Sequence, residues 1–212
     1  MNFNTSGYET TPIVAETLQD FYSTILEYYD ELFPVAEDAI RFLLQIQEEL
    51  KAGFHVQPSP LCRYLGIGCA TGNLENTLAG HGLDVTGIDI NRDMIETAKR
   101  RMKRGFSSSR FFEMSTIDMN RFLKQGSFHI LGCLANTLPY IADETLIRKF
   151  FHDAHELLIS GGKLVIQTLN YDAIPANTPS RLPTLSSIRV SLHRGYIPAE
   201  NETVLLDAVL EL

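Results

Sequence analysis

Cysteine is scarce in this 212-residue chain, which has three, Cys62, Cys69 and Cys133, at no spacing typical of a metal site. An odd number of thiols in apolar sequence favours a reducing compartment, so we expect a cytoplasmic protein with no bound metal. No apolar run approaches the length of a membrane span. The first residues also lack the basic start and apolar core of a signal peptide.

Positive charge is also in short supply. Lysine and arginine number 18 against 26 acidic residues, which gives a net charge of −8 and disfavours nucleic acid as a partner. One basic cluster, residues 99–104, is either a nucleic-acid patch or a solvated helix end whose cations are stabilised by the helix dipole. We favour the second interpretation. With 44% hydrophobic and 21% charged residues, the chain has the composition of an ordinary globular domain with a sizeable core.

The stretch CRYLGIGCATGNLENTLAGHGLDVTGID, residues 62–89, has the order of a nucleotide-binding unit. An apolar run enters a glycine-rich turn at residues 66–72, a short helical segment follows, and a second apolar run ends on Asp89. Strand, glycine turn, helix, strand and acid is the order of such a βαβ unit. Glycines let the backbone pass close to a ligand, and the acid can accept both hydroxyls of a ribose.

The spacing of the glycines indicates which nucleotide is bound. Gly72 comes four residues after Gly68, and Thr71 stands where a dinucleotide fingerprint has its third glycine. An NAD(P)-dependent oxidoreductase is therefore disfavoured, although it stays an alternative. A turn that merely joins a strand to a helix is the other alternative, and Asp89 at the end of the next strand weakens it.

Residues 65–75 resemble the first motif of the Rossmann-like S-adenosylmethionine-dependent methyltransferases. This chain departs from the motif at Gly66, where many members have Asp, and at Ala70, where many have Gly. Residues 133–138 and 170–172 resemble segments of the small-molecule, glycine N-methyltransferase-like branch. The resemblance, which covers roughly residues 20–212, implies an α/β, Rossmann-like, doubly wound and mainly parallel sheet. We expect the strand order 3-2-1-4-5, helices on both faces and a C-terminal antiparallel hairpin.

The resemblance implies S-adenosyl-L-methionine as the cofactor. Asp89 would hold the ribose hydroxyls, and Ile90 and Met94 would enclose the adenine. Thr116 stands where family members commonly have an acid for the adenine amino group, with Asp118 as the alternative. The expected cofactor-binding residues are Tyr29, Gly66, Gly68, Cys69, Thr71, Gly72, Asp89, Ile90, Met94, Thr116, Ile117, Leu134 and Ala135.

Apolar periodicity predicts the remaining elements. Helices are expected from Gln19 to Phe33, from Pro34 to Gly53, from Asn91 to Arg104 and from Asp143 to Ile159. Further strands are expected at residues 110–114, 128–134 and 163–168, and a hairpin within residues 188–212. We expect a flexible N-terminus (1–18), a cofactor-binding core with a helical cap (19–172) and a loop with the hairpin (173–212). Because relatives continue with another helix and two strands, we expect the domain to be truncated.

The function implied is methyl transfer to a small-molecule acceptor by in-line displacement, which needs alignment rather than a nucleophilic side chain. Tyr140, Tyr171 and His129 are candidates for removing a proton, and none is named as catalytic. Leu169 stands where glycine-using members have an arginine, so glycine itself is not the expected acceptor. A cofactor-binding protein without catalysis is an alternative, and a homodimer is a possible assembly.

Overall fold

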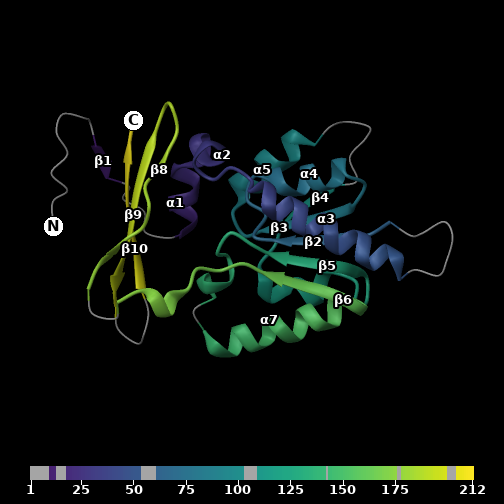
Figure 1. Ribbon diagram of the computed structural model, residues 1–212. Coiled ribbons are helices and arrows are strands. Elements are labelled where there is room, and N and C mark those ends of the chain that lie inside the picture. Colours follow the sequence, from purple (N-terminus) through teal and green to yellow (C-terminus); the bar gives the residue numbers. More distant parts are fainter. Residues whose placement is uncertain are drawn as a thin grey trace. The chain divides into compact units, whose positions relative to one another are not determined.

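The computed structural model describes residues 10–12, 18–53, 61–102, 109–141, 143–175, 178–199 and 204–212 (Figure 1). These residues fall into two compact units. The larger unit runs from Val35 to Leu169, and the smaller one combines the residues up to Pro34 with those from Asn170 onward. The smaller unit thus contains the helices that precede Pro34 together with the C-terminal strands.

Five parallel strands form the sheet of the larger unit: β2 (Arg63–Ile67), β3 (Asp84–Asp89), β4 (Ser109–Glu113), β5 (Phe128–Cys133) and β6 (Leu158–Ile166). Their order is β4-β3-β2-β5-β6, which confirms the predicted order 3-2-1-4-5. The prediction for β6 was wrong at its start, because Leu158 already pairs with Phe128 before the register shifts to Lys163 opposite Ile130. The preceding helix accordingly ends at Leu157 rather than at Ile159.

Helices cover both faces of this sheet: α3 (Glu37–Ala52), α4 (Asn73–Gly80) and α5 (Arg92–Arg101) lie on one face and α7 (Glu144–Leu157) on the other (Figure 1). The short helix α6 (Met119–Phe122) packs on the same face as α7, because Met119 and Phe150 belong to one apolar core. Successive side chains of β2 point to opposite faces of the sheet, as in any β-strand. Tyr64 packs with Leu43 and Leu78 of α3 and α4, whereas Leu65 packs with Phe150 of α7. The two apolar cores hold the sheet between its helices.

Helix starts in this unit follow the expected capping chemistry. The side chain of Asn91 accepts a hydrogen bond from Met94 N at 3.0 Å and caps α5. Asp143 caps α7 in the same way, accepting from Leu146 N at 2.9 Å. The predicted end of α5 at Arg104 lies outside the described residues. Single 3₁₀ turns, η2 (Thr116–Asp118) and η3 (Leu138–Tyr140), follow β4 and β5.

The smaller unit contains α1 (Leu18–Thr24), η1 (Leu26–Tyr28), α2 (Tyr29–Leu32), η4 (Tyr171–Ala173) and an antiparallel sheet. The strands of this sheet are β1 (Thr10–Pro12), β7 (Ser180–Arg181), β8 (Leu185–Ser186), β9 (Ser191–Pro198) and β10 (Val204–Glu211). β9 and β10 form the predicted hairpin, to which β1, β7 and β8 are added. The hairpin thus belongs to a sheet separate from the parallel one. Phe21, Ile25 and Leu32 pack with Val190, Leu192 and Leu210 in its core.

Two expectations for the N-terminal region were wrong. The helix predicted from Gln19 to Phe33 is broken into three short pieces, and the hydroxyl of Thr24 bonds back to Asp20 O at 2.8 Å, a contact that often bends helices. Pro34 does not open the next helix, which begins at Glu37. Of the segment expected to be flexible, residues 1–9 and 13–17 lie outside the described residues, but Thr10–Pro12 pair with β10.

A row of glycines crosses the three middle strands of the parallel sheet. Gly66 of β2 lies opposite Gly87 of β3 and Gly132 of β5. A Cβ atom on Gly132 would lie 2.9 Å from two ring carbons of Tyr64, and one on Gly87 would lie 2.7 Å from Cδ1 of Phe111. The missing side chains therefore make room for two large rings on the face that α4 and α5 cover.

We expect Gly132→Ala to lower the free energy of unfolding by about 1–3 kcal/mol, because the added methyl group overpacks a filled interior. Gly80→Ala is the matched control, since Gly80 ends α4 with nothing within 4 Å of an added Cβ. This control should be neutral or stabilising by up to about 1 kcal/mol. Urea unfolding of both variants makes the comparison, and equal stabilities would contradict the steric role of Gly132.

Candidate functional site

The glycine turn connects the end of β2 to α4 and is tied to the neighbouring strand. The N–H groups of Gly68 and Cys69 both donate to Ile88 O, at 2.9 and 3.0 Å. Gly68 and Gly72 have φ angles of +71° and +69°, values that glycine adopts without steric cost. The backbone of the turn is thus fixed at the carboxyl end of the sheet, where open α/β sheets bind their ligands.

Asp89 connects this turn to the end of β3. Its Oδ2 accepts a hydrogen bond from Ala70 N at 2.8 Å, and its Oδ1 accepts one from Asn91 N at 2.8 Å. Burial raises the pKa of this carboxyl, and the backbone hydrogen bonds that it accepts act in the opposite direction. Because each carboxylate oxygen has two lone pairs, Asp89 can still accept hydrogen bonds from the hydroxyls of a ligand.

A second loop at the same edge of the sheet follows β5. Ala135 and Asn136 have φ angles of +52° and +66°, and Ala70 in the glycine turn has +46°. Asn136 N donates to Gln167 O at 3.1 Å, and the Asn136 side chain accepts from Leu169 N at 3.0 Å. Among the described residues, positive φ angles outside glycine occur at these three positions alone. A positive φ angle in a residue other than glycine strains the backbone, and strained residues are concentrated at functional sites.

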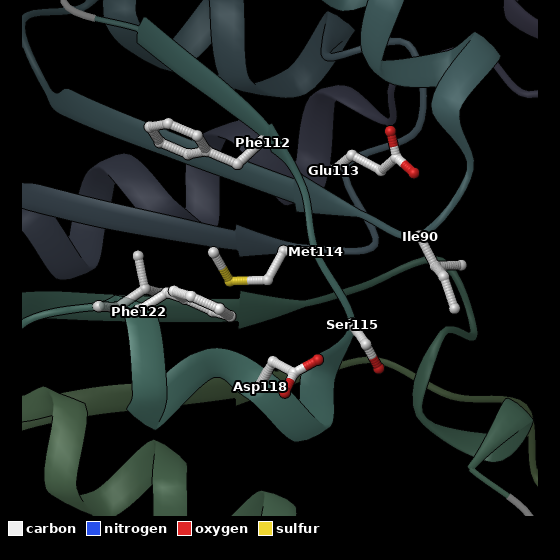
Figure 2. A pocket seen from close by; sticks show the side chains of 8 residues that line it. Ile90, Phe112, Glu113, Met114, Ser115, Asp118 and Phe122 are labelled. Atoms are coloured by element: carbon white, nitrogen blue, oxygen red, sulfur yellow. The ribbon is translucent and has the colours of Figure 1, made fainter.

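A cavity of about 480 Å³ lies beside the carboxyl ends of β3 and β4, within the usual size range of small-molecule pockets. Figure 2 shows Ile90 after β3, Phe112 to Ser115 at the end of β4, Asp118 in η2 and Phe122 in α6. The lining is apolar and aromatic apart from a hydroxyl and two carboxylates. It consists of Ile90, Phe112, Glu113, Met114, Ser115, Asp118, Phe122 and Leu123.

The residues expected around the adenine divide into two groups. Ile90, which is 53% exposed, and Asp118 line the cavity. Met94 is 1% exposed and lies in the interior, so it does not face Ile90 across the cavity. Thr116 and Ile117 are not part of the lining, and Ile117 N already donates to Ser115 Oγ at 3.4 Å. The alternative acid, Asp118, therefore fits this cavity better than Thr116.

Most of the expected cofactor-binding residues in the glycine turn and in the loop after β5 lie in the interior. The thiol of Cys69 packs inward, and burial raises its pKa well above its ordinary value. Gly66 and Thr71 are buried. Leu134 packs against the core of α3 and α4, and Ala135 is exposed, with its N–H donating to the Gln167 side chain at 3.2 Å.

Tyr29 and Tyr171 belong to the smaller unit. Tyr29 stacks on Phe33 with ring centroids 5.0 Å apart. The hydroxyl of Tyr171 lies 3.2 Å from that of Tyr196. Each tyrosine therefore has packing partners within its own unit.

His129 lies near the amino end of β5, opposite to the edge that carries the glycine turn. It is buried, and its Nδ1 accepts a hydrogen bond from Arg63 N at 3.0 Å. Burial lowers the pKa of this imidazole. His129 therefore has a structural role in joining β5 to β2. Tyr140, the remaining candidate for removing a proton, is exposed at the end of η3.

Sequence analysis missed two side chains beneath the loops. A Cβ atom on Gly68 would lie 2.5 Å from Cγ2 and Oγ1 of Thr137, so Thr137 already fills the space beside this glycine. Glu75 lies in the first turn of α4 and is 3% exposed. Its spacing from the buried Leu78 and Ala79 was the available signal, because residues three and four apart share one face of a helix.

Burial raises the pKa of the Glu75 carboxyl from 4.5 to about 8. A hydrogen bond with its own backbone N–H lowers the pKa, and the negative charge of Asp89 raises it further. The folded chain thus retains a proton on Glu75 in a pH range in which the unfolded chain has lost it.

This difference predicts how stability depends on pH. The contribution of the protonated Glu75 to the free energy of unfolding is complete below pH 4.5. It is lost as the pH rises through about 8. The loss should be on the order of a few kcal/mol, at about 1.4 kcal/mol per pKa unit. Urea unfolding between about pH 5 and pH 9 should show a falling free energy of unfolding in the wild type. Glu75→Gln should flatten this curve, and the exposed Glu49→Gln should leave it unchanged.

A parallel sheet in this order, with a glycine turn after its central strand and an acid ending the next, is the arrangement of a Rossmann-like α/β fold. Residues 65–162 match the family model described as a methyltransferase domain. This segment, which holds most of the parallel sheet, is thus similar to a methyltransferase domain.

Named relatives match about half of the chain. A protein of Geobacillus sp. (strain WCH70), whose name assigns it as a methyltransferase only provisionally, is 30% identical over 103 residues, 49% of this chain and 40% of its own. The ubiquinone biosynthesis O-methyltransferase of Coxiella burnetii is 29% identical over 110 residues, 50% of this chain and 43% of its own. The match thus spans about two fifths of the length of these curated relatives.

Solved structures share the fold at low identity. An S-adenosylmethionine-dependent methyltransferase from Clostridium acetobutylicum has a TM-score of 0.59 and 17% identity over 90% of this chain and 81% of its own. An amino pentose methyltransferase from Micromonospora echinaspora, solved with its cofactor, has a TM-score of 0.59 and 16% identity over 89% and 81%. The sugar N-methyltransferase of Streptoalloteichus sp. has a TM-score of 0.57 and 16% identity over 99% and 84%.

Among the residues that the structure describes, no group of three or more histidine, cysteine, aspartate or glutamate side chains is placed to hold a metal ion. No helix in the described part of the chain is long and apolar enough to cross a membrane.

Proposed function

We propose that this chain binds S-adenosyl-L-methionine and transfers its methyl group to a small-molecule acceptor. The observation that carries the proposal is the joint placement of the glycine turn, the Asp89 carboxylate and the cavity beside Ile90 at one edge of the sheet. The free lone pairs of Asp89 fit a ribose, and the apolar cavity with its acidic rim fits an adenine. The match of residues 65–162 to the methyltransferase domain supports the same assignment.

In this proposal the cofactor supplies a methyl group that its sulfonium makes electrophilic. Asp89 accepts hydrogen bonds from the ribose hydroxyls, Ile90 covers one face of the adenine and Asp118 accepts a hydrogen bond from its amino group. Gly66 at the end of β2 and the glycine turn, from Gly68 to Gly72, bring their backbone against the methionine end. Positioning of donor and acceptor in line then provides the rate, because no covalent intermediate with the protein is required.

A small-molecule acceptor is supported by the relatives, whose names refer to ubiquinone biosynthesis, an amino pentose and a sugar. The acceptor is not expected to be glycine, since Leu169 offers no guanidinium to pair with a carboxylate. The remaining expected contacts, from Tyr29, Leu134 and Ala135, are part of the proposal. The three cysteines are free and buried, which supports our proposal of a cytoplasmic location.

Release of S-adenosylhomocysteine in the presence of a panel of phenols, amines and amino sugars tests the reaction. Calorimetric titration with S-adenosylmethionine and with NAD⁺ tests the cofactor. We expect binding of the first and not of the second. Binding without turnover of any acceptor would support the alternative of a binding protein, and binding of NAD⁺ alone would contradict the proposal.

Asp89→Ala should weaken S-adenosylmethionine binding by about 2–3 kcal/mol, because two hydrogen bonds to a charged group are lost. Asp84→Ala is the control, since Asp84 begins the same strand at its opposite end and forms an ion pair with Arg110 at 2.5 Å. Calorimetry should give the wild-type dissociation constant for the control. An unchanged constant in Asp89→Ala, with the fold verified by circular dichroism, would exclude the ribose assignment.

Asp118→Ala and Thr116→Val separate the two candidates for the adenine amino group. We expect Asp118→Ala to weaken S-adenosylmethionine binding by about 1–2 kcal/mol, since one hydrogen bond to a carboxylate is lost. Thr116→Val should have little effect, because Thr116 does not line the cavity. The reverse order of effects, measured by the same calorimetric titration, would assign the contact to Thr116.

A further inference from the structure

The side chain of Glu75 occupies the space that Gly66 leaves empty. A Cβ atom built on Gly66 would lie 2.9 Å from Cδ of Glu75, and it would overlap Oε1. Gly66 lies in β2, two residues before Gly68 opens the glycine turn. Helix α4 therefore delivers a carboxyl group to the surface of the sheet, directly before the turn that the proposed function places against the cofactor.

This carboxyl group is buried without a full set of partners. Its Oε2 has no hydrogen-bond partner among the described residues, and the side chain is 3% exposed. The titratable groups that interact with it are Asp89 at the end of β3, Tyr64 in β2 and Cys69 in the turn. None of these three groups carries a positive charge. A buried acid in such surroundings is costly, and a buried polar atom left unpaired calls for a specific explanation.

A ligand with positive charge would explain the acid. In a medium of low dielectric constant, a nearby cation favours the ionised form of a carboxyl and is attracted by it more strongly than in water. S-adenosylmethionine carries two such charges, the sulfonium and the ammonium of its methionine end. Glu75 is the acid that lies in the space beside Gly66, immediately before the turn that would hold this end of the cofactor.

We propose that Glu75 is the counter-charge for the cationic end of the cofactor, supplied from α4 through the gap at Gly66. This inference rests on the proposed function. When the cofactor binds, the carboxyl releases its proton to solvent and the carboxylate stabilises the bound positive charge. In the cofactor-free chain the group holds its proton at neutral pH, since burial raises its pKa to about 8. Cofactor binding is therefore linked to release of a proton.

Glu75→Gln removes the charge and keeps the volume of the side chain. We expect its affinity for S-adenosylmethionine to fall on the order of tenfold or more, as for the loss of an interaction between charged groups. Its affinity for adenosine, which has the ribose and the base without either charge, should match the wild type. S-adenosylhomocysteine, which keeps the ammonium and lacks the sulfonium, shows which of the two charges Glu75 serves.

Proton release gives a readout that a merely structural role would not change. Titration of S-adenosylmethionine near pH 7 in two buffers of different ionisation enthalpy should show release of close to one proton from the wild type, since the carboxyl holds its proton below about pH 8. Glu75→Gln should release none. Equal affinities and equal proton release in the two proteins would overturn the role of Glu75. If the wild type bound neither adenosine nor S-adenosylmethionine, the proposed function itself would fail.

If Glu75→Gln folds poorly, the role of the carboxyl can still be tested by moving it from residue 75 to residue 66. Gly66→Asp alone should lower the thermal unfolding temperature, because its Cβ overlaps Glu75. The double variant Gly66→Asp with Glu75→Ala returns a carboxyl to the same space from the strand. It should unfold at a higher temperature than Gly66→Asp and regain proton-linked binding of S-adenosylmethionine. A stable double variant that binds the cofactor without proton release would contradict the proposal.

Discussion

The carboxylate of Asp89 fixes the geometry on which the candidate site depends. It accepts one backbone hydrogen bond from Ala70 in the glycine turn and another from Asn91, the cap of α5. One side chain thus joins the turn after β2, the end of β3 and the start of the next helix. Its burial opposes ionisation and raises the pKa of the carboxyl, and the backbone hydrogen bonds that it accepts offset part of that cost. The same carboxylate has further lone pairs that can accept hydrogen bonds.

A second constraint is the lack of side chains in the middle of the sheet. Gly66, Gly87 and Gly132 lie side by side in three strands, and the space above them is filled by Tyr64, Phe111 and Glu75. The rings of Tyr64 and Phe111 stabilise the core by packing. Glu75 is an acid with an unpaired oxygen, which costs stability. The space at Gly66 is therefore filled by Glu75, a buried carboxyl group whose protonation makes the stability of the fold depend on pH.

Backbone strain is concentrated at the same edge of the sheet. Ala70 and Ala135 adopt positive φ angles, and Asn136 follows Ala135 with another. An L-residue in this conformation costs on the order of 1–3 kcal/mol, so the surrounding hydrogen bonds must hold it there. After β5, the hydrogen bonds of Asn136 with Gln167 and Leu169 stabilise the strained backbone. In the glycine turn, the hydrogen bond from Ala70 N to Asp89 does the same.

The sequence by itself determined the local units of the parallel sheet: its strands apart from the start of β6, the glycine turn, and the acid at Asp89. These depend on residues within a few positions of one another. The strand order was implied by the resemblance to Rossmann-like methyltransferases. Only the tertiary structure decided that Ile90 faces the cavity while Met94 is buried, and that Asp118 rather than Thr116 lines it. It also placed Glu75 against Gly66 and Thr137 against Gly68. These facts depend on the rotation of each helix against the sheet and on contacts between distant segments, which no local pattern encodes.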